Sequence, residues 1–273
     1  MSAQNVDGPP SGAAPLIHFV GVDHEYASRD GQVKALEDVN LSIAEGQFVS
    51  IVGPSGCGKT TLMMAIGGFV RLSSGTLRVA DQPVDGPDPS RAVVFQADSV
   101  FPWRTVVHNI EYGPQMRGVP ASARRAEAQQ LIDRVGLTGF EKRYPRDLSG
   151  GMRKRVDIAR AYANNPRILL MDEPFGSVDA ITRDALQADL LRLWETERTT
   201  VVFVTHDIEE AILLGDRVVV MSGRPGRVIA DIDVPFPRPR DPQALRTDAD
   251  FVALRAELND LLDHSPTAAT PKR

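Results

Sequence analysis

One stretch of the sequence decides the fold: it reads FVSIVGPSGCGKT and occupies residues 48–60. Its first five residues form a nearly continuous apolar run, which is typical of a buried β-strand. The next eight fit the pattern G-x-x-x-x-G-K-[S/T], in which a glycine-rich turn joins a strand to a helix. Glycines let successive backbone N–H groups point inward, and the start of the following helix adds partial positive charge. The stretch therefore predicts a loop that binds phosphate groups.

The residue types in this loop indicate a nucleotide. The Lys59 ammonium is expected to bridge the β- and γ-phosphates, and the Thr60 hydroxyl is expected to coordinate Mg²⁺. Cys57, the single cysteine of the chain, is interpreted as a small loop residue rather than as a redox centre. A chance glycine-rich turn is the alternative, but the strand before it and the helix after it favour the nucleotide site. The predicted nucleotide-binding residues are Gly53, Pro54, Ser55, Gly56, Cys57, Gly58, Lys59, Thr60 and Thr61.

Two acidic residues, Asp172 and Glu173, end a second hydrophobic run at residues 168–171. A carboxylate at the end of such a strand can hold Mg²⁺, directly or through water, opposite Thr60. The neighbouring Glu173 is expected to polarise the attacking water as a general base. An acidic turn without function is the alternative, and the phosphate loop elsewhere in the chain makes it the weaker interpretation.

Between these two elements lies the motif LSGGM, residues 148–152, at the start of a predicted helix. Ser149, Gly150 and Gly151 form a second small anion site at a helix start, unless they are only a serine N-cap with flexible glycines. With all three motifs, the sequence resembles an ABC-type ATPase over residues 16–262. The resemblance implies ATP and Mg²⁺ as ligands, ATP hydrolysis, and a homodimer in which each LSGGM motif closes over the partner's ATP.

Further residues take their expected roles from this resemblance. Gln96 matches the Q-loop glutamine that contacts Mg²⁺ and water, and His206 matches the switch histidine that reaches the γ-phosphate. Asp179 matches the D-loop, which crosses the dimer interface. Tyr26 lies where the family stacks an aromatic ring on adenine, although a half-buried strand aromatic is an equal alternative. The expected catalytic residues are Glu173, His206, Lys59 and Gln96, and the expected magnesium ligands are Thr60, Gln96 and Asp172.

The sequence departs from the family pattern at three positions. Met152 and Lys154 stand where many members carry glutamine, and Val178 replaces the usual leucine of the D-loop. Lys154 keeps a hydrogen-bond donor and adds a positive charge. Because none of the residues needed for hydrolysis is missing, we expect an active ATPase.

Alternating strand-like and helical segments predict an α/β fold. With the resemblance, this becomes a P-loop NTPase with a RecA-like core, an antiparallel β subdomain and an inserted α-helical subdomain. Residues 17–20 and 39–43 alternate apolar and polar, which predicts antiparallel strands. Further strands are expected at residues 76–79, 92–95, 168–171, 201–204 and 218–221. The expected boundaries are 1–15 for a disordered N-terminal tail, 16–96 and 166–235 for the nucleotide-binding core, 97–165 for the helical subdomain, and 236–273 for a C-terminal extension.

The C-terminal extension is expected to contain an amphipathic helix. Thr247 and Asp250 are predicted to form a capping box at its start. Phe251, Leu254 and Leu258 follow at helical spacing and should pack on the body of the protein.

Composition narrows the classes of function. The 273 residues are 42% hydrophobic and carry a net charge of -5, so no basic face for nucleic acid is expected. A single cysteine allows no intramolecular disulfide, which favours a reducing compartment. Because no apolar run is long enough to span a bilayer, a role at the cytoplasmic face of the membrane must come through a partner.

Three stretches resemble the nitrate/sulfonate/taurine-type importers within the family. They are FPWRTV at residues 101–106, DEPFG at 172–176 and MSGRPGR at 221–227. The resemblance implies a separate membrane permease, an extracytoplasmic substrate-binding protein, and docking of the permease near Trp103. Core packing is the equal alternative for Trp103. Uptake of a small anion or sulfonate is the expected function, and lipid or lipoprotein extraction or a division-associated role is the alternative.

Overall fold

The chain forms two compact units, Met1–Pro87 with Val202–Arg273, and Asp88–Val201. The computed structural model describes residues 15–28 and 31–265. Except for Pro15, the predicted N-terminal tail lies outside the described residues, as does the end of the chain after Ser265.

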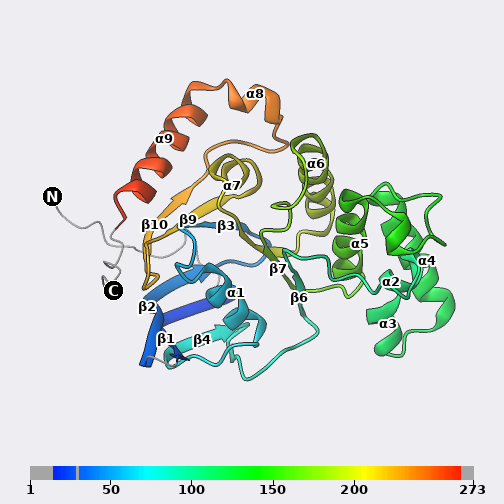
Figure 1. The fold of residues 1–273 in the computed structure, drawn as a ribbon, viewed down its shortest axis with the longest axis horizontal. Helices are drawn as coiled ribbons and strands as arrows, with labels where there is room; N and C mark the ends of the chain where they lie inside the picture. The colour runs from blue at the N-terminus through cyan, green and yellow to red at the C-terminus, as the bar shows by residue number, and fades with distance from the viewer. Residues whose placement is uncertain (1–14, 29–30, 266–273) are drawn as a thin grey trace. The chain divides into compact units, whose positions relative to one another are not determined.

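The first unit contains an antiparallel sheet with the strand order β2-β1-β4-β5 (Figure 1). Strand β1 spans Ile17–Ser28 and β2 spans Gly31–Ile43, and Ile17 pairs with Ile43. This confirms the antiparallel strands predicted at 17–20 and 39–43. Both strands are longer than predicted, because pairing continues past the register shifts that interrupt the apolar alternation. Strand β4 spans Ser74–Val79, and β5 spans Gln82–Pro83.

The phosphate loop of the first unit follows a buried parallel strand. Strand β3, Phe48–Val52, runs parallel to β9, Arg217–Met221, and every residue of both strands is buried. Strand β10, Val228–Asp233, pairs antiparallel with β9, so residues 222–227 connect two neighbouring antiparallel strands. Helix α1 follows the loop and spans Lys59–Gly67. The continuous apolar run at residues 48–52 therefore forms a strand that is covered on both faces, as predicted.

Helix α7, Ile208–Leu214, is held at its C-terminal end by an arginine of the extension. Arg240 is buried, and its Nη1 atom donates to the carbonyl oxygens of Ile212 (2.8 Å), Leu213 (3.0 Å) and Gly215 (2.7 Å). These carbonyls lie at the end of a helix, where the last C=O groups lack partners within the helix. The guanidinium therefore acts as a cap that the extension supplies.

The C-terminal extension forms helices α8, Pro242–Arg246, and α9, Ala249–Asp263. Helix α9 contacts α7 and β9 (Figure 1). Phe251, Leu254 and Leu258 are buried in a cluster with residues of these elements, which confirms the predicted apolar face.

The predicted capping box at the start of this helix is wrong. Asp248 is the N-cap residue, and its carboxylate accepts hydrogen bonds from the N–H groups of Asp250 (2.9 Å) and Phe251 (3.2 Å). The Thr247 hydroxyl instead donates to the carbonyl of Ala244 at 2.9 Å. The helix begins one residue later than predicted, because an aspartate at the N-cap can satisfy two N–H groups by itself.

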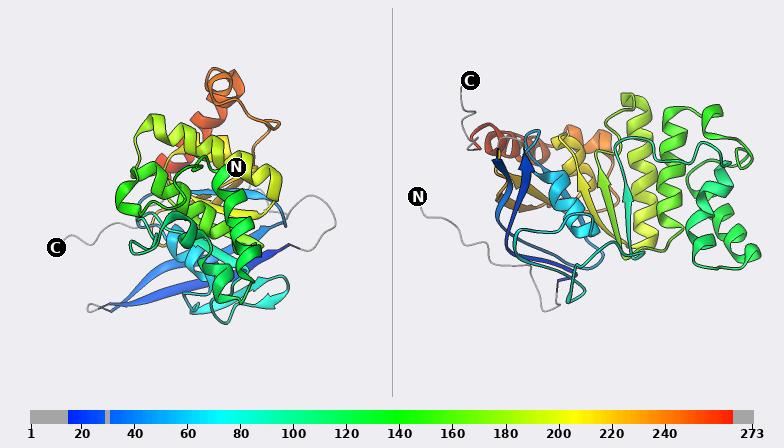
Figure 2. Two further views of the ribbon diagram at one scale, coloured as in Figure 1. Left: turned by 90° about the vertical axis from the view of Figure 1, so that its right-hand side faces the viewer. Right: turned by 60° about the horizontal axis from the view of Figure 1, so that its bottom comes forward.

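The second unit pairs β6, Arg91–Val94, with β7, Ile168–Asp172, in parallel. Between these strands the described chain is helical or irregular, which confirms the absence of strands predicted for residues 97–165. The helical elements are α2 (Val106–Ile110), α3 (Tyr112–Met116), α4 (Ala121–Arg134), the 3-10 turn η1 (Pro145–Asp147) and α5 (Gly150–Tyr162). Figure 2 shows the helices of this segment gathered together in green, and α2 contacts α3, α4 and α5.

After β7, helix α6 spans Ala180–Glu197, and β8, Thr200–Val204, leads back to the first unit. The N–H of Thr200 donates to the carbonyl of Arg167 at 3.1 Å within the second unit. Just past the other end of β8, the N–H of Thr205 donates to the carbonyl of Ile51 at 3.1 Å within the first unit. The division into core, helical subdomain and C-terminal extension stays a prediction.

Candidate functional site

The loop of residues 53–60 has a backbone that requires glycine. Gly56 and Gly58 have φ angles of +74° and +104°, a region that side chains with a Cβ rarely adopt. A Cβ on Gly58 would also stand 2.8 Å from the carbonyl oxygen of Ala35. Gly58 is the N-cap of α1, and no side-chain hydrogen bond caps this helix start. This is the geometry of an anion-binding loop.

Lys59 lies inside this loop and is only 6% exposed. Its Nζ atom donates to the carbonyl oxygens of Gly53 (2.7 Å) and Pro54 (3.0 Å), so the ammonium is held at the loop by the chain itself. A buried ammonium at the start of a helix creates a concentrated positive charge, which favours a multiply charged phosphate group.

Cys57 belongs to the same loop, and its side chain is buried, at 1% exposure. Burial raises the pKa of its thiol above the usual value, and the positive charge of Lys59 only partly opposes this. Because the thiolate is the reactive form of cysteine, these properties support the interpretation of Cys57 as a packing residue.

Tyr26 projects from β1 next to the first turn of α1. Its hydroxyl lies 3.2 Å from the Thr61 hydroxyl, and its ring packs edge-on against His24 with centroids 4.5 Å apart. The side chain is 41% exposed, which leaves ring surface for stacking. The structure thus brings two predicted nucleotide-binding residues together, and the adenine contact of Tyr26 stays a prediction.

His206 leaves the end of β8, and its neighbours on both sides are fixed. The Thr205 hydroxyl donates to Glu210 at 2.5 Å, and the Asp207 N–H donates to the Thr205 oxygen at 3.0 Å. Because Thr205 also bonds to Ile51 of β3, the exposed His206 emerges close to the strand that enters the phosphate loop. Thr205 and Glu210 match no sequence motif, because their contact joins a strand end to a helix.

In the second unit, Gln96 and Glu173 face the same small space. Val94 pairs with Met171, so β6 and β7 end together just before these residues. A Cβ built on Gly176 would lie 3.6 Å from Nε2 of Gln96 and 3.7 Å from Oε2 of Glu173. Glu173 itself has a φ angle of +41°, a strained conformation of the kind that clusters at functional sites.

The LSGGM motif forms the tip of α5, as predicted. The Ser149 oxygen accepts a hydrogen bond from the N–H of Met152 at 3.2 Å, so the serine is an N-cap. This observation is compatible with an anion site, because the hydroxyl hydrogen remains available as a donor to a ligand. Gly151 is buried, whereas Ser149 is exposed at the helix start.

Asp179, the predicted D-loop residue, is the N-cap of α6. Its carboxylate accepts from the N–H of Thr182 at 3.0 Å. This hydrogen bond is the main reason why the pKa of the Asp179 carboxyl lies below its usual value. The side chain therefore fixes the start of the helix that follows the D-loop, a role that the sequence pattern did not reveal.

Trp103 is 71% exposed, so the core-packing alternative for this residue is wrong. Its ring lies 5.6 Å from that of Phe101, which lines an open groove of about 450 Å³ in the second unit. Aromatic, apolar and basic side chains form the groove, among them Phe95, Tyr112, Met116, Arg117 and Arg160. Since Phe95 immediately precedes Gln96, this groove lies next to the predicted Q-loop.

The predicted magnesium ligands fit the ion chemically. Thr60, Gln96 and Asp172 offer hydroxyl, amide and carboxylate oxygens, the hard donors that Mg²⁺ prefers. In residues 15–28 and 31–265, no three His, Cys, Asp or Glu side chains gather as a metal site. A magnesium ion bound largely through nucleotide phosphates needs only one or two protein ligands.

Among residues 15–28 and 31–265, no helix combines the length and the apolar character needed to cross a bilayer.

Comparisons with known proteins agree with these features. A family model described as ABC transporter matches residues 36–176. A putative ATP-binding protein of Brucella abortus is 47% identical over 243 residues, which is 88% of this chain and 91% of the relative. The taurine import ATP-binding protein TauB of Escherichia coli is 44% identical over 238 residues, or 86% and 93% of the two chains.

A solved structure supports the fold. It is described as a dimeric structure of a post-hydrolysis state of the ATP-binding cassette MJ0796, bound to ADP and Pi. The two folds match with a TM-score of 0.70 at 31% identity, over 81% of this chain and 100% of that chain. This match confirms the predicted α/β fold of the P-loop class.

Proposed function

The chain belongs to the ATP-binding subunits of ABC transporters, and from this premise we propose that it drives uptake of a small anion or sulfonate through a separate permease. The activity of the chain itself is ATP hydrolysis. The 44% identity to a taurine import protein, and the stretches at residues 101–106 and 221–227, support the importer class.

Residues from several of the predicted motifs take part in the proposed reaction. The phosphate loop with Lys59 binds the triphosphate, and Tyr26 stacks on the adenine. Glu173 accepts a proton from the attacking water, while Gln96 orients that water. His206 contacts the γ-phosphate. Thr60, Gln96 and Asp172 would hold a magnesium ion, which would neutralise part of the phosphate charge.

The second copy of the chain completes the site. In the proposed dimer, Ser149 and the glycines after it close over the nucleotide held by the partner's phosphate loop, and Asp179 crosses the interface beside it. The exposed Ser149 hydroxyl can donate to a phosphate oxygen while its oxygen still caps α5. ATP thus holds two copies together, and cleavage of the γ-phosphate removes the contact that joins them.

The observation that carries the transport proposal is the exposed Trp103 beside the groove next to Gln96. A large aromatic side chain that is 71% exposed is typical of an interaction surface. We propose that a permease segment occupies this groove, with apolar side chains toward Phe101 and Met116. Contact near Gln96 then links the nucleotide state to the conformation of the permease. The chain is accordingly placed at the cytoplasmic face of the membrane, bound peripherally.

Reconstitution with the permease tests this proposal. The chain is purified together with its permease and substrate-binding protein, and the complex is placed in liposomes. ATP hydrolysis should rise when taurine, another sulfonate or nitrate is supplied with the binding protein, and the substrate should accumulate inside. Stimulation by lipid or lipoprotein release, with no uptake of any of these anions, would instead support the extraction class.

A further inference from the structure

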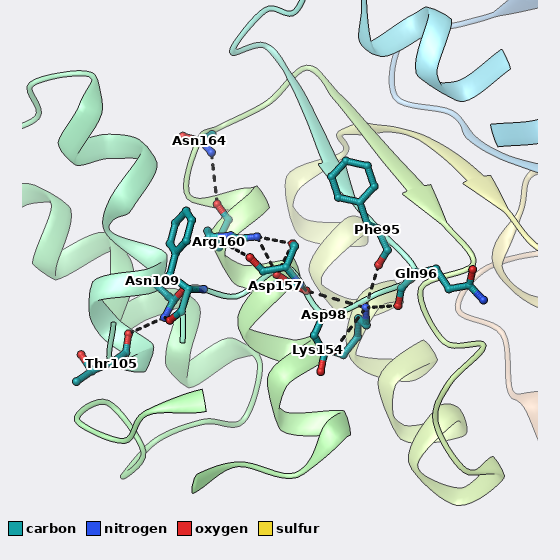
Figure 3. Close-up of polar contacts among 11 residues, drawn as sticks. Phe95, Gln96, Asp98, Thr105, Asn109, Lys154, Asp157, Arg160 and Asn164 are labelled. Atoms are coloured by element: carbon teal, nitrogen blue, oxygen red, sulfur yellow. Dashed lines mark hydrogen bonds and ion pairs between the residues drawn. The ribbon is translucent and has the colours of Figure 1, made fainter. Parts of the chain in front are cut away.

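Lys154 is a lysine with almost no contact with water. It lies on α5, one helical turn after the LSGGM tip, and is 1% exposed. Its Nζ atom donates to the carbonyl oxygens of Phe95 at 3.0 Å and Gln96 at 3.2 Å (Figure 3). Lysine is almost never fully buried unless its charge is paired, so this burial requires an explanation.

Neighbouring carboxylates balance the charge of Lys154 without being its hydrogen-bond partners. Asp157 and Asp98 each lie 4.0 Å from Nζ. Asp98 accepts from Nε of Arg153 at 2.6 Å. Removal from water lowers the pKa of Lys154, and the two acids oppose this shift. The ammonium is therefore directed at the backbone of residues 95 and 96, while the acids offset part of its desolvation.

The residues after Gln96 are also bound to α5. Asp157 accepts from the N–H of Ser99 at 3.0 Å and from its hydroxyl at 2.9 Å, and Arg160 donates to the Ser99 carbonyl at 2.8 Å. Positions 153, 157 and 160 recur at helical spacing and so share one face of α5, and Lys154 adjoins them. Figure 3 shows Lys154, Asp157 and Arg160 extending from the same helix toward the segment after Phe95. Lys154 extends this attachment back to Gln96 itself.

We propose that Lys154 is a positioning residue that holds the backbone of Gln96 at a fixed distance from the LSGGM tip. This inference rests on the proposed function, in which Gln96 serves the nucleotide of its own subunit and Ser149 serves the nucleotide of the partner. A shift of the Q-loop is then passed to α5, so one nucleotide site senses the other. A lysine at this position supplies three N–H donors, enough to bind two carbonyls at once.

Three variants test this role in the full-length protein. Lys154→Met keeps the length of the side chain and removes its donors, whereas Lys154→Gln restores an N–H donor of shorter reach. Lys142→Met removes an exposed lysine of the same unit and serves as the matched control. Steady-state ATPase rates, nucleotide affinity, thermal unfolding and amide hydrogen exchange over residues 95–101 are measured for each.

Loss of the donors should lower kcat of Lys154→Met by roughly 10- to 100-fold, as expected when a group near the chemistry is misplaced. Nucleotide affinity should stay close to the parent value, because the phosphate loop is untouched. Exchange at residues 96–99 should speed up, and Lys154→Gln should recover most of the lost rate. The Lys142→Met control should match the parent in all four measurements.

Two results would overturn the proposal. One is an unchanged kcat in Lys154→Met. The other is a lower kcat that is explained entirely by a smaller fraction of folded protein. In that case, hydrogen exchange at residues 96–99 would not be faster than in the parent, and Lys154→Gln would recover no activity. Failure of the shared site on which this inference rests is seen separately, since a mixture of Lys59→Ala and Ser149→Asp would then be no faster than its components.

Discussion

A Cβ atom on Gly151 would stand 2.4 Å from Cγ2 of Thr182. Helix α5, which begins at the LSGGM motif, and helix α6, which follows the D-loop, thus approach each other closely at a residue without a side chain. The N–H of Thr182 is also bound to Asp179. A side chain at position 151 would therefore displace both predicted interface motifs at once.

Replacing Gly151 by alanine should destabilise the protein by about 1–3 kcal/mol, the usual cost of overpacking. Thr182→Ser removes the obstructing methyl group and should restore most of the loss in the double variant. Denaturant unfolding measures both effects. Gly150→Ala is the control, because its Cβ would meet no atom closer than 3.7 Å. A double variant as unstable as Gly151→Ala alone would show that the methyl contact is not the cause.

Glu173→Gln should slow hydrolysis by roughly 10²- to 10⁴-fold, because an amide cannot accept the proton of the attacking water. ATP should still bind, and size-exclusion chromatography with ATP should reveal an accumulated dimer. Glu257→Gln changes an exposed glutamate of α9 and controls for loss of charge. Turnover close to that of the parent would remove Glu173 from the role of general base.

Two inactive variants should complement each other if the site is shared between copies. Lys59→Ala should abolish ATP binding. Ser149→Asp keeps an N-cap for α5 but lacks the hydroxyl donor and places negative charge toward the phosphates. Mixed in equal amounts, they should recover up to about a quarter of the parent rate, since half of the dimers are mixed and each has one intact site of two. Ser149→Thr, which keeps the hydroxyl, controls for changes at the tip. A mixture no faster than its components contradicts the shared site.

Trp103→Ala should leave the ATPase activity and stability of the isolated chain nearly unchanged, because the side chain is 71% exposed. Substrate uptake by the reconstituted transporter should fall, since the proposed permease contact is lost. Co-purification of the permease and uptake into liposomes measure this. Phe69→Ala, another exposed aromatic that lies outside the groove, is the control. Normal uptake in the Trp103 variant would rule out this residue as a docking contact.

Arg240→Met should lower the free energy of unfolding by about 1.5–3 kcal/mol, as for other lost hydrogen bonds to a charged group. Three carbonyls at the end of α7 lose their donor in this variant. Arg246→Met, which removes an exposed arginine paired with Glu209, should cost no more than about 1 kcal/mol. Denaturant titration measures the free energy of unfolding of both variants. Equal losses would show that the Arg240 cap stabilises the protein no more than an exposed ion pair does.

Motifs whose function depends on a contiguous stretch could be predicted from the sequence. The run at residues 48–60 determines a strand, a turn and a helix start through local rules alone, and the structure confirms all three. Ser149 and Asp179 were found by their motifs, but their N-cap hydrogen bonds became visible only in the structure. The capping box failed because Asp248, adjacent to the predicted Thr247, satisfies two N–H groups alone.

Contacts between residues far apart in the chain escaped prediction. The sequence marks Lys154 as a departure from the family pattern, yet its partners Phe95 and Gln96 lie 59 and 58 positions away. Arg240 reads as one basic residue among several in a proline-rich segment, and only the fold brings it to α7. Hydrophobic periodicity indicates which face of a helix or strand is buried. It carries no information about which polar group of another element will be buried against that face.

The single thiol of this protein belongs to Cys57 of the phosphate loop, and it is buried and has a raised pKa. Alkylating reagents that consume thiolates should therefore modify the native protein slowly and the opened loop quickly. The rate at which Cys57 is alkylated, followed by mass spectrometry, then measures the rate of loop opening. No engineered cysteine is required, because the chain has only this one.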